Sequence, residues 1–221
     1  MGAVDPAIRA VATTGGQILR AATGLVATRP AGKPLHPRGS LVSGTLSRFG
    51  CEERTGAAWL DHVGRDRVLV RVSRAVGLPS GVPDIYGLAL RAPTSDGHGD
   101  LLFASTGLGR FTRFVLTVTR SPGGRAMTTL LPYRTPAGAV LLSAVFDDDS
   151  DDDSKVSLAW AIRTGAWHRF AHLVLDDDPV AQGDEHVSFD PVCNVLPGLE
   201  NYPWVRLLRE PSYVTARRSR S

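Results

Sequence analysis

The sequence predicts a mainly β protein: an antiparallel β-barrel with a few peripheral α-helices. From Leu41 onward, short apolar segments recur along the chain, and clusters of turn-forming residues such as 121–124 and 136–138 separate them. Short strands at this spacing are typical of an antiparallel barrel or sandwich. With 221 residues, of which 43% are hydrophobic, the chain is long enough to bury one sizeable core.

In chain order, the expected strands are Leu41–Arg48, Val68–Arg74, Ile85–Arg91, Asp100–Thr106, Arg113–Arg120, Met127–Arg134, Ala139–Phe146, Lys155–Ile162, His168–Leu175 and His186–Phe189. Two short helices are expected, at Thr55–Val63 and Tyr202–Arg218. The acidic runs Asp147–Ser154 and 176–178 are expected to be solvated loops, because they lack the glycine and the ordered oxygen ligands of a calcium loop.

The first residues differ in composition from the rest. Residues 5–28 are rich in alanine, and their larger apolar residues recur at helical spacing. We therefore divide the chain into a helical N-terminal extension, residues 1–32, and a barrel with a C-terminal helix, residues 33–221. The proline-rich stretch 29–37 would connect them.

Charge and composition argue against several classes of protein. The net charge is only +3, the excess basic residues gather in the last few positions, and the aromatic residues are scattered, so nucleic-acid binding is not predicted. No apolar run is long enough for a membrane span, and no secretory signal is recognised. Cys51 and Cys193 have no metal-ligand spacing, which predicts reduced thiols in a cytoplasmic protein.

The C-terminal stretch 207–220 carries a distinctive pattern. At helical spacing, Arg209, Tyr213, Arg217 and Arg220 form one stripe, in which guanidinium groups flank a phenol. Positive charge lowers the pKa of a phenol, and tyrosinate is a known ligand of haem iron. The arginines could also pair with haem propionates. The competing interpretation is a solvated basic tail.

Three upstream stretches carry further candidates. His36 precedes Gly39 and Gly44 at the entrance of a strand, where it could act as a general acid and base or simply cap the strand. In Val68–Arg74, the alternation places Arg71 and Ser73 on the face opposite the valines, and the sequence leaves open which face turns inward. Ser105 ends an apolar strand, where it could line a pocket or open the next loop.

In this order and at these separations, the segments resemble the catalase family. His36 with Gly39 and Gly44 is similar to the distal histidine motif His-x-x-Gly-x-x-x-x-Gly of that family. The other similar segments are Val70–Ser73, Asp84–Ala89, Asp100–Thr106, Phe189–Pro191, Val195–Glu200 and Arg209–Tyr213. The resemblance runs from Lys33 to Arg220 and is densest at its two ends.

The resemblance implies a catalase-like barrel that holds haem b and cleaves peroxide or an organic hydroperoxide. It places His36 above the haem as the acid–base group, with Ser73 orienting it, and Tyr213 below as the iron ligand with Arg209 beside it. The implied propionate partners are Lys33, Arg71 and Arg220, and Ser105 takes the place of an asparagine that orients peroxide. The alternative is a barrel without haem that binds another small molecule or a protein. Oligomerisation stays open.

Overall fold

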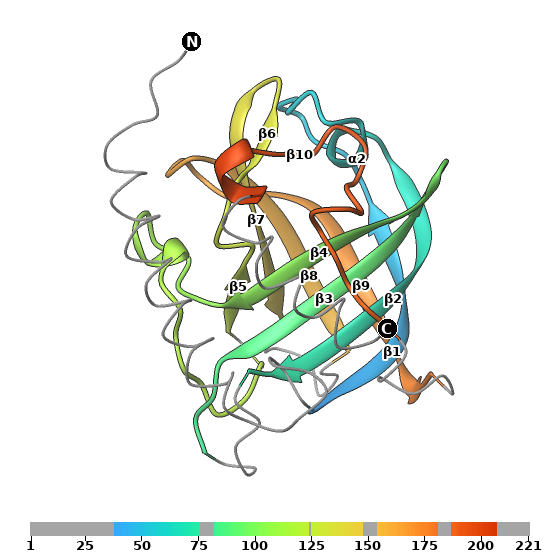
Figure 1. Cartoon of the computed structure of the whole chain (residues 1–221), viewed down its shortest axis with the longest axis vertical. Helices are drawn as coiled ribbons and strands as arrows, with labels where there is room; N and C mark the ends of the chain where they lie inside the picture. Colours follow the sequence, from blue (N-terminus) through green and yellow to red (C-terminus); the bar gives the residue numbers. More distant parts are fainter. Residues whose placement is uncertain (1–37, 76–81, 124, 148–153, 181–186, 207–221) are drawn as a thin grey trace.

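The apolar segments fold into one antiparallel sheet of ten strands in a computed structural model, which describes residues 38–75, 82–123, 125–147, 154–180 and 187–206 (Figure 1). The strands are β1 Arg38–Arg48, β2 Gly64–Arg74, β3 Tyr86–Thr94, β4 Gly97–Ser105, β5 Ala126–Thr128, β6 Tyr133–Thr135, β7 Gly138–Phe146, β8 Lys155–Ile162, β9 His168–Pro179 and β10 Glu200–Asn201. The helical elements are α2, Ala58–Asp61, and the 3₁₀ turn η1, Thr112–Phe114; residues 203–206 are also helical.

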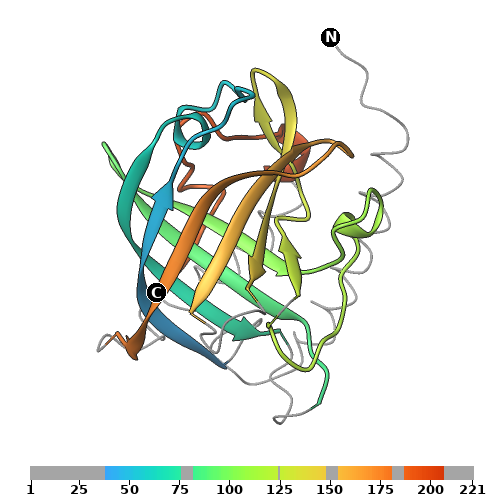
Figure 2. The ribbon, with the colours of Figure 1, turned by 180° about the vertical axis from the view of Figure 1, so that it is seen from behind.

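The sheet closes on itself. The ladder runs β7–β5–β4–β3–β2–β1–β9–β8, and β8 pairs again with β7, so that eight strands form a barrel. β6 and β10 extend the sheet beside β7. The wall formed by β2, β3 and β4 lies opposite the wall formed by β8 and β9, as the two views show (Figures 1 and 2). The predicted antiparallel barrel is therefore confirmed.

The core shows which face of the strand Val68–Arg74 turns inward, a point that the sequence left open. Val68 and Val70 point into the barrel, at 3% and 0% exposure. Arg71 and Ser73 consequently point outward, because successive side chains of a strand lie on opposite faces. Neither is solvated, however, since both are buried as well. The rest of the core comes from the apolar positions of the neighbouring strands, among them Leu88, Leu101, Trp160 and Phe170.

One end of the barrel is closed by α2 and the segment 195–205. Leu60, Leu196 and Leu199 are almost fully buried there, and each buried leucine contributes roughly 1.5–3 kcal/mol. The two pieces touch through backbone: a Cβ on Gly198 would lie 2.5 Å from Cα of Ala57. Gly198 also has φ +83°, a conformation that glycine adopts without steric cost.

Three strand predictions need correction. Arg113–Arg120 is not a strand: η1 occupies its first residues, and only isolated bridges at Leu116 and Thr119 follow. The segment 127–134 is broken into β5 and β6 around Leu130, whose φ of +58° does not belong to a strand. Residues 187–189 of the expected strand His186–Phe189 are not in a strand either.

The two acidic runs behave differently from each other. Residues 176–178 lie within β9 rather than in a loop, and Asp176 forms an ion pair with Arg67 of β2. The other run connects the antiparallel neighbours β7 and β8, as a hairpin loop would, although its residues 148–153 lie outside the described part of the chain. Within the described residues, no helix combines the length and the apolarity needed to cross a membrane.

Candidate functional site

The outward faces of β1 to β4 place several small residues near Arg71. Directly opposite residues of an antiparallel pair share a face, so the register places Arg71 and Ser73 with the small side chains of their neighbours. These are Gly39, Gly87, Ala89 and Ala104, while the larger Leu41 lies directly opposite Arg71 and Leu102 directly opposite Ala89. We call Arg71, Ser73 and the four small residues the outer face.

The Arg71 side chain lies against the backbone of β1. It is only 8% exposed, and a Cβ built on Gly39 would come within 2.8 Å of its Cζ atom. Glycine at position 39 therefore lets the guanidinium approach the strand. Gly39 is also the first glycine of the histidine motif, so one purpose of that glycine is to seat Arg71.

Ser73 lies next to a cavity at the end of the barrel. Its hydroxyl donates a long hydrogen bond of 3.5 Å to the carbonyl oxygen of Gly87. A cavity of about 360 Å³ opens beside it, within the size range of small-molecule sites. The cavity is lined by Gly39, Ser40, Val72, Ser73, Arg74 and Tyr86.

The structure does not bring Ser105 to the outer face. Ala104 shares the outer face, so Ser105, its neighbour in β4, points the opposite way. Its hydroxyl is fully buried, donates to the carbonyl oxygen of Thr117 at 2.6 Å and accepts from the backbone N–H of Tyr86 at 3.1 Å. In this position Ser105 ties the segment after β4 to the start of β3.

The remaining predicted site residues lie outside the described part of the chain. These are Lys33, His36, Arg209, Tyr213 and Arg220. Their assignments as distal histidine, iron ligand and propionate partners stay predictions. Among the residues that the structure describes, no three histidine, cysteine or acidic side chains gather as a metal site would require.

The Arg71 guanidinium can hold an anionic group. A buried guanidinium suits a carboxylate because its N–H donors form a planar fork. Gly87 and Ala89 of β3 are small enough for a planar group to approach the backbone beside it. Haem carries such carboxylates in its propionates, and Arg71 is the only predicted propionate partner that the described residues include.

The role of Asp100 was missed at the sequence level. Its carboxylate is 1% exposed and accepts two hydrogen bonds from Arg91, one from the backbone N–H of Asp190 and one from the side-chain amide of Asn194. Asp190 in turn caps the turn that follows it, accepting from the N–H of Val192 at 3.0 Å. These contacts hold the segment around Asp190 against β3 and β4. The register of the β3–β4 hairpin, which pairs Arg91 with Asp100, is the pattern that could have predicted them.

Both cysteines are free, as the sequence predicted. Cys51 accepts a hydrogen bond from the indole N–H of Trp160 at 2.9 Å. Burial raises the pKa of the Cys51 thiol, and the Trp160 hydrogen bond opposes this shift only in part. Cys51 is therefore held as a thiol within the barrel wall rather than as a nucleophile.

The closed antiparallel barrel and its outer face define a catalase-like β-barrel. Solved structures with this fold include a bacterial catalase (TM-score 0.55, 16% identity), catalase A from Saccharomyces cerevisiae (0.60, 13%) and a fungal catalase (0.60, 15%). They cover 84%, 84% and 92% of this chain, which spans only 56%, 60% and 62% of theirs. At these identities the likeness concerns the fold alone. No family model matches the chain. No curated protein matches it either.

Proposed function

We propose that this protein binds haem b against the outer face and, with haem bound, cleaves hydrogen peroxide or organic hydroperoxides. The observation that carries the proposal is the buried Arg71 guanidinium, which lies against β1 at Gly39 and suits a propionate. The likeness of the barrel to catalases supports haem as the cofactor. The helical spacing of Arg209 and Tyr213 supports a tyrosinate ligand.

Each predicted residue has one role in this proposal. Tyr213 binds the iron as a phenolate, and Arg209 keeps it ionised by placing positive charge beside the oxygen. Arg71 pairs with one propionate, and Lys33 and Arg220 supply further positive charge for the propionates.

In this proposal, His36 transfers the proton. When bound, haem supplies the electrons that cleave the O–O bond. The imidazole of His36 accepts the proton of one peroxide oxygen and returns it to the departing oxygen, which leaves as water or an alcohol. The Ser73 hydroxyl donates toward Gly87, so its oxygen is suited to accept an N–H of that imidazole and hold the tautomer. We assign no peroxide contact to Ser105, because its hydroxyl is buried and bonded within the fold.

A second candidate is a catalase-like barrel that holds another anionic small molecule without haem. The placement of Ser105 favours it, since the residue that stands for the distal asparagine points away from the outer face. Arg71 and the cavity beside Ser73 would serve such a ligand equally well.

Haem titration of the purified protein separates the two candidates. We expect a ferric-tyrosinate haem spectrum that Tyr213→Phe abolishes and that the matched variant Tyr202→Phe retains, because Tyr202 lies outside the proposed site. Arg71→Ala should weaken haem binding by about tenfold, the effect of losing one charge-assisted contact, whereas Arg65→Ala, exposed on the same strand, should not.

The acid–base role is tested on the loaded protein. His36→Ala should retain haem and slow peroxide cleavage by about 10²-fold or more, and His98→Ala, an exposed histidine of the β3–β4 hairpin, should leave the rate unchanged. Full turnover by His36→Ala would refute the role of His36. A protein that stays colourless after haem is added would instead support the second candidate.

A further inference from the structure

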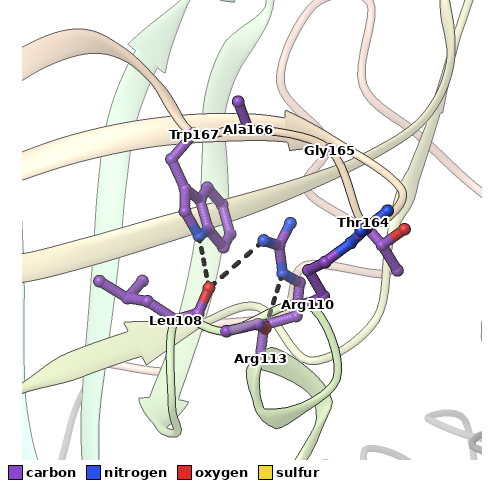
Figure 3. Close-up of a pocket in the computed structure, with 8 residues that line it drawn as sticks. Leu108, Arg110, Arg113, Thr164, Gly165, Ala166 and Trp167 are labelled. Carbon is purple, nitrogen blue, oxygen red and sulfur yellow. Dashed lines mark hydrogen bonds between the residues drawn. The ribbon is translucent and has the colours of Figure 1, made fainter.

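A second buried arginine, Arg113, lies in the connection between β4 and β5. Arg113 of η1 is 2% exposed, and its guanidinium lies 4.4 Å from the ring centroid of Trp167. It donates to the carbonyl oxygens of Gly109 at 3.1 Å, Leu108 at 3.3 Å and Arg163 at 3.3 Å. The Trp167 indole donates to the same Leu108 oxygen at 2.9 Å (Figure 3).

Within the described part of the chain, no carboxylate pairs with this arginine. Among the described residues, Arg113 bonds only to neutral carbonyl oxygens, and the nearby Arg110 forms no ion pair. Burial, together with the positive charge of Arg110, lowers the pKa of Arg113. A buried charge is costly unless it is paired. The site therefore gains free energy from any anionic group that reaches it.

The surroundings of Arg113 have the composition of a protein interface. A cavity of about 390 Å³ lies between residues 108–113 and 164–167, with Arg110 and Trp167 in its lining (Figure 3). Beside it, Leu108 is 38% and Phe111 76% exposed, and the same connection also exposes Val115 and Val118. Tryptophan and arginine are the side chains that most often dominate binding energy in such interfaces, and exposed apolar clusters mark contact surfaces.

We propose that this surface docks a partner protein through an acidic side chain flanked by apolar residues. The partner's carboxylate enters the cavity and pairs with Arg113 and Arg110. Its apolar neighbours cover Leu108 and Phe111. This surface is independent of the proposed haem site, because it is built on the β4–β5 connection and the β8–β9 turn.

The test uses the full chain and a terminally blocked peptide in which glutamate alternates with leucine. The indole N–H resonance of Trp167, assigned with Trp167→Phe, reports binding in the ¹⁵N-labelled protein. The glutamate peptide should shift it, and a glutamine peptide of the same length should bind at least about tenfold more weakly, as expected when a charge pair is lost.

Two variants test the arginine without removing the buried side chain. Arg110→Glu should weaken the glutamate peptide by about tenfold or more, because it reverses a charge beside the anchor. Arg125→Glu, exposed farther along the same connection, should not. The proposal is overturned if neither peptide shifts Trp167, if both bind equally, or if free glutamate at the same carboxylate concentration binds as well as the peptide. That last result would identify a small-anion site instead.

Discussion

At the scale of the residue, two serines on the wall of the barrel show how one position in the strand alternation decides a role. Ser73 shares a face with Arg71 and borders a cavity. Ser105 points to the opposite face, and its hydroxyl forms hydrogen bonds with the backbone of Thr117 and Tyr86. The sequence placed both in one site because their motifs follow each other in the family order. The face that each occupies follows only from the register.

Ser105→Ala should therefore destabilise the fold rather than affect the chemistry. The change leaves the buried N–H of Tyr86 and the carbonyl oxygen of Thr117 without their partner, at a cost of about 1–3 kcal/mol. Urea unfolding measures it, with Ser47→Ala, an exposed serine of β1, as the control expected to stay within about 0.5 kcal/mol. A variant of unchanged stability with slower peroxide cleavage would show that Ser105 contacts the substrate instead.

At the scale of the element, the sequence was most informative where strands are long and alternating. β7 and β8 match their predicted ranges to within one residue, because their apolar runs are buried in the core. β1 and β2 end at the predicted residues but begin at Arg38 and Gly64, earlier than predicted. The connection between β4 and β5 was mispredicted. Several of its apolar residues are exposed, so they do not pack into the core as the side chains of a strand would.

The contact between α2 and the segment after β9 should depend on a glycine. Gly198 and Gly138 both have positive φ, +83° and +122°, so alanine is strained at either position. Only at 198 would the new Cβ also meet backbone, 2.5 Å from Cα of Ala57, whereas at 138 it meets open space. Gly198→Ala should thus lower the free energy of unfolding by more than Gly138→Ala, by about 1–3 kcal/mol of overpacking. If urea unfolding shows equal losses of stability for the two variants, the contact between α2 and residue 198 adjusts to the new Cβ without a measurable cost.

At the scale of the whole molecule, closure of the barrel could not be read from the sequence. Pairing of β1 with β9 joins segments far apart in the chain, and no local pattern encodes that partner. The family resemblance supplied the architecture instead. It could not reveal the Arg113 surface, since an arginine in an expected strand gives no indication of burial against Trp167.

Asp100 joins the β3–β4 hairpin to the segment around Asp190, and its loss should lower the stability of the whole fold. The carboxylate holds Arg91 of β3 and the segment around Asp190 to the same wall. Asp100→Asn removes the charge but keeps the shape, which leaves the Arg91 guanidinium short of its partner and should cost about 3–5 kcal/mol, as for other broken buried pairs.

The matched control is Asp176→Asn, which breaks the exposed pair with Arg67 and should cost no more than about 1 kcal/mol. Urea unfolding followed by tryptophan fluorescence compares the two variants at one pH. If they lose similar amounts, the segment 188–201 is held by its leucines in the barrel end and not by the Asp100 carboxylate. If only Asp100→Asn is strongly destabilised, one buried carboxylate joins the last described segment to the barrel wall.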